Sequence, residues 1–192
     1  GDWDEGYSIQ KTSDQGYIIV GHATPFGADN YDVYLIKTNV NGETLWTKTY
    51  GGPENERGLS VQQTSDHGYI LVGYTLSFGA GNSDVGLIKV DSLGNLLWLK
   101  TYGGSGDDIG ESVQQTYDGG YIVVGNTELF GAGNGDVYLI KTDADGDTLW
   151  TKTYGDIYQD FGYSVQLTTD QGYVIAGSKL SPGSLSDVYL IK

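Results

Sequence analysis

Short apolar runs recur along the chain at a fixed spacing, and each run is bounded by glycine and polar turn residues. A Ser-aliphatic-Gln step begins at Ser8, Ser60, Ser112 and Ser164, so successive starts lie 52 residues apart. A fixed period of this size indicates one supersecondary unit that is copied and stacked, because a single unit cannot bury its own apolar face. We therefore predict a single domain over 1–192, with repeat units at approximately 1–52, 53–104, 105–156 and 157–192.

The third unit shows which secondary structure the pattern favours. Its segments 111–116, 121–125, 136–142 and 148–154 are short, rich in β-branched and aromatic residues, and separated by clusters of Asp, Asn and Gly. Such segments are typical of strands joined by tight turns, and no stretch has the 3.6-residue period of a helix. We label the four expected strands of a unit a, b, c and d in chain order.

The expected strands differ in the arrangement of their apolar positions. Strand b, for example 121–124, is apolar on both faces, which suits a strand packed between two neighbouring sheets. Strand d, for example 149–154, alternates and carries a lysine, which suits an outer edge that must avoid pairing with other chains. The last unit ends at Lys192, after strand c, so this sequence contains no outer strand for it.

Small four-stranded antiparallel sheets repeated at about 40 to 50 residues are the signature of β-propeller blades. The sequence therefore predicts an all-β fold, a β-propeller of four blades with a repeat of 52 residues. Each blade is expected to be a four-stranded antiparallel meander, except that the last blade lacks its outer strand. We expect the blades to surround a pseudo-four-fold axis, with the a strands nearest the centre.

The repeat resembles a known family. The segment Leu-Trp-Thr-Lys-Thr-Tyr-Gly-Gly at 45–52, followed by Ser-Val-Gln-Gln-Thr-Ser-Asp at 60–66 and Asp-Val-Gly-Leu-Ile-Lys at 84–89, is similar to bacterial and archaeal β-propeller repeats that are distantly WD-repeat-like. The resemblance covers nearly the whole chain. It implies an extracellular or cell-surface location and a structural or protein-interaction role in a large secreted assembly, although fold alone does not determine function.

Composition excludes several classes of partner. The net charge is −15, with 25 acidic against 10 basic residues, so we expect no binding to nucleic acid and no attraction to an anionic membrane. No segment approaches the roughly 20 apolar residues of a membrane-spanning helix, so no membrane insertion is expected. The absence of cysteine excludes disulfides and thiol catalysis and fits an exported protein. The absence of methionine, even at position 1, favours a processed or excerpted piece of a longer product.

Two glycine-containing motifs have simple structural explanations. The segment Asp-Ala-Asp-Gly-Asp at 143–147 has the oxygen spacing of a calcium loop, but its copies at 39–43 and 91–95 lose the charges, which favours a hairpin turn. The Phe-Gly-Ala loops precede strands rather than helices and therefore lack the geometry of a phosphate cradle. They are expected to be connections between strands b and c with positive φ. The acids that follow these loops are expected to cap them: Asp32, Asp84, Asp136 and Asp187.

Catalysis has little support in the sequence. His22 and His67 occupy different places in their units, and no Ser-x-x-Lys or Gly-x-Ser-x-Gly motif is present. An active site is asymmetric, whereas the units are nearly identical, so we expect a protein that is not an enzyme. A carbohydrate- or peptide-binding propeller is the alternative, and a polysaccharide lyase or glycosidase is a distant one.

Acidic residues concentrate on the b–c loops and the d–a linkers, which emerge on the same side of a meander. No cofactor is required by the sequence, but this side is expected to offer carboxylates to Ca²⁺, with Asp84, Asp107, Asp108 and Asp136 as candidate ligands. The rival interpretation is that the surplus charge maintains solubility.

The open edge of the last blade is the expected site for a protein partner. A strand c without a neighbouring strand d exposes backbone donors and acceptors that invite pairing. The partner is expected to be another protein chain, including a copy of this one or a segment of a longer parent protein. The residues expected to contact it are Trp3, Asp187, Leu190 and Ile191; Trp3 is included because it breaks the repeat.

Overall fold

The computed structural model describes residues 4–24, 30–181 and 186–192. Its regular secondary structure consists of fifteen strands in four antiparallel sheets, and no described segment is helical. The strands are β1 (Asp4–Lys11), β2 (Tyr17–Ala23), β3 (Asp32–Thr38), β4 (Thr44–Tyr50), β5 (Glu56–Gln63), β6 (Tyr69–Thr75), β7 (Asp84–Val90), β8 (Leu96–Tyr102), β9 (Asp108–Gln115), β10 (Tyr121–Thr127), β11 (Asp136–Thr142), β12 (Thr148–Tyr154), β13 (Asp160–Leu167), β14 (Tyr173–Lys179) and β15 (Asp187–Ile191).

Each repeat unit forms one blade. Blades one, two and three are the meanders β1–β4, β5–β8 and β9–β12, and blade four is the three-stranded sheet β13–β15. This confirms the predicted fold class, an all-β propeller-type fold of four blades with a three-stranded last blade. The strands expected from the third unit also fall where the sequence placed them, within a few residues at each end.

A glycine in the second strand of each blade allows the first strand to bulge. In blade two, β5 and β6 change register between Gly58 and Ser60. A Cβ on Gly73 would lie 1.8 Å from the carbonyl oxygen of Arg57 across this pair, so no larger residue fits there. The equivalent glycines of the other blades have the same contact, which explains why the pattern Gly-x-Ser in the first strand and a glycine in the second recur together.

The turns confirm the hairpins that the sequence predicted. In the turn between β11 and β12, Asp143 Oδ1 accepts hydrogen bonds from the amides of Asp145 and Asp147, at 3.0 and 2.8 Å, while Gly146 has φ +80°. The segment 143–147 is therefore an Asx-type hairpin turn. In the long connection before β11, Gly131 and Gly135 have φ +148° and +152°, which confirms the expected positive φ.

A lysine on the third strand of each blade pairs with an aspartate in the turn between the first two strands. In blade three, Lys141 Nζ lies 3.0 Å from an oxygen of Asp118 and donates to the carbonyl of Thr142 at 2.8 Å. The Lys141 side chain is only 5% exposed, so these two contacts satisfy a charge that is otherwise buried. The same pair recurs in the other blades: Lys37–Asp14, Lys89–Asp66 and Lys192–Asp170.

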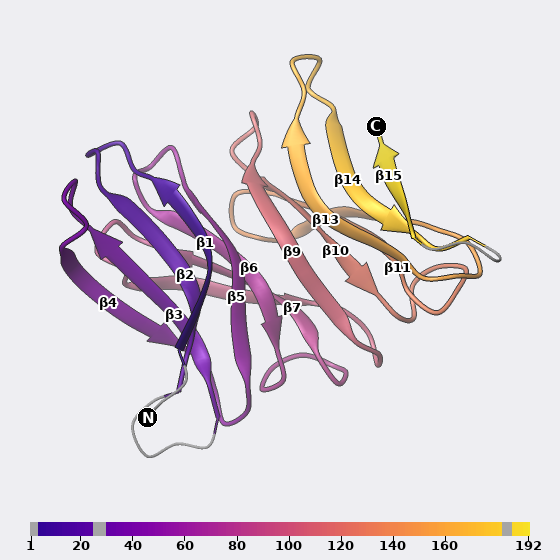
Figure 1. The fold of residues 1–192 in the computed structure, drawn as a ribbon, viewed down its shortest axis with the longest axis horizontal. Coiled ribbons are helices and arrows are strands. Elements are labelled where there is room, and N and C mark those ends of the chain that lie inside the picture. The colour runs from indigo at the N-terminus through magenta and orange to yellow at the C-terminus, as the bar shows by residue number, and fades with distance from the viewer. Residues whose placement is uncertain (1–3, 25–29, 182–185) are drawn as a thin grey trace.

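Consecutive blades pack face to face. The first strand of each blade lies against the first three strands of the blade before it, so β9 contacts β5, β6 and β7, and β13 contacts β9, β10 and β11. Three apolar clusters fill the boundaries between blades one and two, two and three, and three and four. The first strands thus lie next to one another along one side of the array, as expected (Figure 1).

The blades form an open arc. Figure 1 shows them following one another from blade one on the left to blade four on the right, with the two end blades apart. No apolar cluster of the described residues joins blade four to blade one. The four expected blades are therefore present in order, but their arrangement around the expected pseudo-four-fold axis is not closed in the described residues. The angle between neighbouring blades is set inside each boundary, and three repeats of that angle leave the first and last blades unpaired.

Candidate functional site

The boundary between blades two and three shows what a complete blade-to-blade contact requires. Blade two contributes the side chains Ile70, Val72, Val85 and Leu87, and blade three contributes Val113, Tyr121, Val123 and Ile140. All eight are 5% exposed or less. At the outer side, the Trp98 ring meets the Tyr121 ring edge-on with centroids 5.9 Å apart, and the Tyr102 hydroxyl donates to the carbonyl of Gly146 at 2.6 Å. The boundary is thus an apolar core closed by aromatic contacts.

Glutamine side chains connect the first strands across the boundaries. The amide of Gln115 donates to Gln62 Oε1 at 2.6 Å, and the amide of Ser65 donates to Gln115 Oε1 at 2.8 Å. The first of these bonds recurs at the other two boundaries, from Gln63 to Gln10 and from Leu167 to Gln114. Each bond joins residues 53 apart, so the pairing register between blades is the same at every step.

A glycine on each incoming first strand permits close approach to the preceding blade. A Cβ on Gly110 would lie 2.4 Å from Val72 Cγ2 and 2.9 Å from Val85 Cγ1. Gly58 and Gly162 have equivalent contacts at the other boundaries. In blade one the equivalent residue is Gly6, and a Cβ there would meet only Ile19 of its own blade among the residues that the structure describes, at 3.7 Å. The space in front of Gly6 is the space that a preceding blade would occupy.

Blade four carries an apolar face that no described residue covers. We name it the tail face and define it as Val174, Ala176, Val188 and Leu190, the positions equivalent to Ile70, Val72, Val85 and Leu87. Val188 is 90% exposed and Leu190 is 68% exposed. Monomeric proteins rarely leave contiguous apolar sheet positions open to water, so this face is a candidate binding surface.

Blade one carries the complementary face. We name it the head face and define it as Ile9, Tyr17, Ile19 and Ile36, the positions equivalent to Val113, Tyr121, Val123 and Ile140. Ile9 is 64% exposed, whereas the three valines at its place in the other blades are buried. The other three residues are half-buried. Both ends of the arc therefore present one half of a boundary that occurs complete three times within the molecule.

The structure separates the residues predicted to contact a partner. Leu190 belongs to the tail face, whereas Ile191 is buried in the core between blades three and four. Asp187 is exposed at the start of β15, which is the outermost strand of its sheet. Trp3 lies outside the described residues. Sequence reasoning identified the open edge of β15 but missed the head and tail faces, although the residue equivalences that reveal them are present in the sequence.

The predicted metal ligands belong to different places. Asp84 and Asp108 approach each other across the boundary between blades two and three, where oxygens of both lie within 2.6 Å of the position that a Cβ on Gly103 would take. Asp107 instead accepts hydrogen bonds from the amide and the hydroxyl of Ser83, at 3.1 and 2.9 Å. Asp136 approaches Asp160 at the next boundary, around Gly155. Within the described ranges no three acidic, histidine or cysteine residues gather around a common point.

These boundary acids cap loops. Asp84 Oδ2 accepts hydrogen bonds from the amides of Ala80 and Gly81, at 3.0 and 3.1 Å, which confirms the predicted capping role of this position. Asp108 Oδ2 accepts from the amide of Gly104 at 2.8 Å. Burial raises the pKa of Asp108, and the charges of Asp84 and Asp107 add to that rise. One oxygen each of Asp108, Asp136 and Asp160 is buried without a hydrogen-bond partner.

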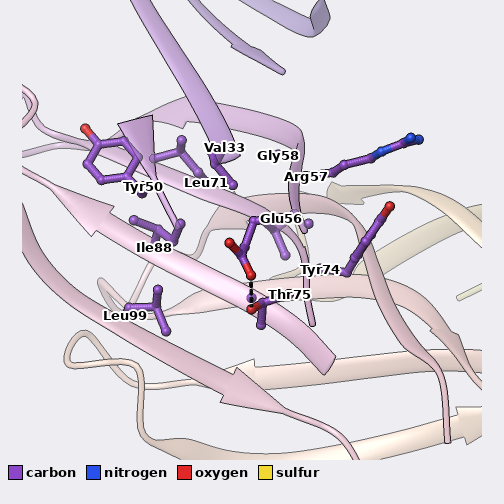
Figure 2. A pocket seen from close by; sticks show the side chains of 13 residues that line it. Val33, Tyr50, Glu56, Arg57, Gly58, Leu71, Tyr74, Thr75, Ile88 and Leu99 are labelled. Carbon is purple, nitrogen blue, oxygen red and sulfur yellow. Dashed lines mark hydrogen bonds between the residues drawn. The ribbon is translucent and has the colours of Figure 1, made fainter. Parts of the chain in front are cut away.

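The boundary between blades one and two contains a small cavity. Gly86 on β7 lines it, at the place where blades one, three and four have Tyr34, Tyr138 and Tyr189. Glu56 accepts a hydrogen bond from the Thr75 hydroxyl at 2.9 Å beside it (Figure 2). The cavity has a volume of about 10 Å³, which is room for roughly one water molecule. It is too small to hold an organic ligand.

Near this cavity lies a polar aromatic cluster that breaks the repeat. The His22 ring lies 4.6 Å from the Tyr31 ring and 5.6 Å from the Tyr7 ring, and the Arg57 guanidinium lies 4.9 Å from the Tyr31 centroid. Figure 2 shows Arg57 pointing away from the cavity. Burial and the Arg57 charge lower the pKa of His22, so its ring is neutral at pH 7. Sequence reasoning missed this cluster, although its members have no counterparts of the same type at the other two boundaries.

Comparison with known proteins identifies the kind of fold but no family. No family model matches the sequence. The regulatory protein FlaEY of Caulobacter vibrioides is 31% identical over an alignment of 120 residues, and the match covers 55% of this chain and 13% of that protein. The chain thus corresponds to a small part of that relative's length.

Two solved structures are similar over nearly the whole chain. A protein of Bifidobacterium bifidum s17 named as an exo-beta-1,3-galactanase has a TM-score of 0.53 and 13% identity, over 98% of this chain and 67% of its own. Sqt1 from Chaetomium thermophilum has a TM-score of 0.48 and 11% identity, over 92% of this chain and 41% of its own. At 13% identity, the similarity to the Bifidobacterium protein shows the fold alone. No helix in the described part of the chain is long and apolar enough to span a bilayer.

Proposed function

We propose that this chain is a non-catalytic structural and protein-interaction module that associates with other protein segments by packing blade on blade. The observation that carries the proposal is the pair of uncovered apolar faces at the two ends of the arc. Removing apolar surface from water contributes about 25 cal/mol per Å² before the entropic costs of association are subtracted, so faces built like an internal boundary favour a partner built like a blade.

Two further features support the proposal. The internal boundaries use the same residue types at the same positions, so one kind of contact serves every step. The resemblance to propeller repeats of large secreted proteins agrees with a module that works as part of an extracellular or surface assembly.

The test extends the chain in register. Lys192 is equivalent to Lys141, so a copy of residues 142–192 appended after Lys192 supplies the missing outer strand of blade four and a fifth, three-stranded blade. If faces of this kind pack on further blades, the tail face becomes buried in the extended chain. Hydroxyl-radical labelling of the Leu190 side chain should then fall strongly relative to the original chain, because this labelling reports the exposure of side chains rather than backbone pairing.

The free energy of unfolding of a single-substitution variant tests the same burial of the tail face. Val188→Asp should destabilise the extended chain by about 3 kcal/mol, because it buries an unpaired charge, and the original chain by less than about 0.5 kcal/mol. Val40→Asp is the matched control, since Val40 lies in an exposed turn of blade one and is 59% exposed. Equal effects of Val188→Asp in both chains would contradict the proposal.

A carbohydrate- or peptide-binding role is the second candidate, and the cluster of His22, Tyr7, Tyr31 and Arg57 favours it. Aromatic rings beside an arginine are a common way to hold a polar ligand. Glycan arrays probed with the chain and with Arg57→Gln test this role. Binding that persists in Arg57→Gln, or no binding by either protein, would count against this cluster as the site.

Calcium binding by the acidic side stays a prediction. The structure divides the proposed ligands between two boundaries, so any site would combine Asp84 with Asp108, or Asp136 with Asp160. Thermal unfolding in Ca²⁺ and in a chelator, at matched ionic strength, tests it. Asp107→Asn serves as the control, since Asp107 bonds Ser83 instead.

A further inference from the structure

We infer that the tail face of one copy of this chain binds the head face of a second copy, so that blade four of one molecule and blade one of the next form a fourth blade boundary. This inference rests on the proposed function and names the partner. It differs from pairing at the edge of β15, because the contact is made by side chains of sheet faces rather than by backbone groups.

The two faces match position by position. At the three internal boundaries the four tail-type residues are aliphatic, and the tail face has Val174, Ala176, Val188 and Leu190 at those places. The four head-type residues of blade three are Val113, Tyr121, Val123 and Ile140, and the head face has Ile9, Tyr17, Ile19 and Ile36. A copy docked in the internal register therefore places apolar residues opposite apolar residues throughout.

The inferred contact between two copies can also form the close glycine packing and the glutamine hydrogen bond of an internal boundary. At the internal boundaries a glycine packs on two valines, as Gly162 does on Val124 and Val137. In the inferred contact, Gly6 of the second copy meets Ala176 and Val188, and among the described residues only Ile19 of its own blade is in contact with the Cβ position of Gly6. The side chain of Gln166, which is exposed, takes the role of Gln114 and accepts from the Lys11 amide of the second copy.

The inferred contact lacks the outer aromatic part of an internal boundary. Blade four has no strand equivalent to β12, so Tyr17 of the second copy finds no counterpart of the Trp150 ring, which contacts Tyr173 inside the molecule. Each copy also carries a charge of −15, which opposes association. The contact should therefore be weaker than an internal boundary and should strengthen as added salt screens the repulsion.

The contact is heterologous, which sets the design of the experiment. Each chain has one head face and one tail face, so copies join head to tail and close into a ring or continue as a filament. Sedimentation of the unmodified 192-residue chain, from about 1 to about 300 µM, should show reversible association in this concentration range, where contacts of modest size are populated. A mass that stays that of one chain throughout would overturn the inference.

Two single substitutions disable one face each. Gly6→Val blocks the close approach at the head face, and Val188→Asp places a charge on the tail face; each should weaken association at least about tenfold. Neither should change the folding of a single chain, since both positions are exposed. Val40→Asp adds the same charge away from both faces and should leave association unchanged.

Mixing the two variants identifies the geometry. The intact tail face of the Gly6→Val chain can still bind the intact head face of the Val188→Asp chain, so the mixture should form a one-to-one dimer while each variant alone stays monomeric. Association that survives Gly6→Val, or a mixture that stays monomeric, would overturn the head-to-tail contact. If the 192-residue chain is monomeric while the extended chain buries Val188, the inference fails and the proposed function stands.

Discussion

The same six residues, Asp-Val-Tyr-Leu-Ile-Lys, occur in blade three at 136–141 and in blade four at 187–192. Both copies form the third strand of a blade and pair with the second strand in the same register. Yet Val137 is completely buried whereas Val188 is 90% exposed, and Leu139 is 2% exposed whereas Leu190 is 68% exposed. Local sequence determines that both segments are strands, and the neighbouring blade alone determines whether their apolar residues contribute to stability.

The comparison between blades three and four predicts the largest difference in stability for substitutions of Leu139 and Leu190. Leu139→Ala should destabilise the protein by about 2–5 kcal/mol, because it leaves a cavity in the core between blades three and four. Leu190→Ala should change the free energy of unfolding by less than about 0.5 kcal/mol in a single chain, because it removes an exposed side chain. Chemical denaturation at low protein concentration measures both. Similar effects of the two substitutions would show that the tail face is covered in solution.

The glycines of the first strands give a second pair. Gly110→Ala should destabilise by about 1–3 kcal/mol, since its Cβ would lie 2.4 Å from Val72 Cγ2 and the blades would have to move apart. Gly6→Ala should be nearly neutral, because no atom in the described part of the chain would lie closer than 3.7 Å to the added methyl group. Thermal unfolding of the two variants at equal concentration makes the comparison. A neutral Gly110→Ala would mean that the boundary is looser than described.

The lysine-aspartate pairs give a third test, in which the free energy of unfolding is measured as a function of pH. Asp118→Asn should destabilise by about 1 kcal/mol, a modest value because the carboxylate is 59% exposed and screened by solvent, although it neutralises a buried lysine. Asp170→Asn should have a smaller effect, since its partner Lys192 is 64% exposed. The Thr116 hydroxyl and the Lys141 ammonium lower the pKa of Asp118 to about 2.

The sign of the pH dependence follows from that pKa. In the unfolded chain an aspartate has a pKa of about 3.9. The stabilisation by ionised Asp118 is therefore present above about pH 4 and disappears as the pH falls through about 2. The difference in unfolding free energy between the parent protein and Asp118→Asn should shrink over this range. A difference that is constant down to pH 2 would show that Asp118 acts through packing.

The smallest expected effect compares the first two boundaries. Gly86→Ala adds a methyl group where the nearest atom would be 3.7 Å away, and alanine restricts the unfolded chain more than glycine does. The substitution should therefore stabilise the protein by about 0.5–1 kcal/mol. Differential scanning calorimetry can resolve such a shift. A destabilisation would mean that the cavity beside Gly86 holds a water that the methyl group displaces.

The fold could be predicted closely because the repeat multiplies each local signal. The turn residues at 143–147 and the apolar second strands appear in several copies, so a weak signal in one unit was supported by the others. Closure could not be predicted, because the angle between blades depends on side-chain packing such as that of Gly110 on Val72, and a one-dimensional pattern contains no angle.

The candidate site was predicted only in part. Leu190 was expected to contact a partner because its strand has an open edge, whereas the structure shows that its side chain belongs to an exposed apolar face. The importance of Ile9 and Gly6 was missed because isoleucine and glycine also occur at the buried positions of the other blades. These two residues differ only in that no described blade packs against them. The grouping of Asp84 with Asp108 and the separation of Asp107 likewise depend on loop geometry that adjacent residue numbers do not reveal.

The constant spacing of the hydrogen bonds between blades allows whole repeat units to be lost or gained in evolution. Because every boundary joins residues 53 apart in the first strands, deleting residues 53–104 would place blade one against blade three with an equivalent glutamine bond, glycine contact and set of apolar partners. Only the cluster of His22 and Tyr31 would change, because Ile109 would replace Arg57. Genes that encode near-identical repeats readily lose or gain whole units by unequal recombination. In this architecture such an event keeps the main contacts of each boundary, so arrays of different length remain foldable.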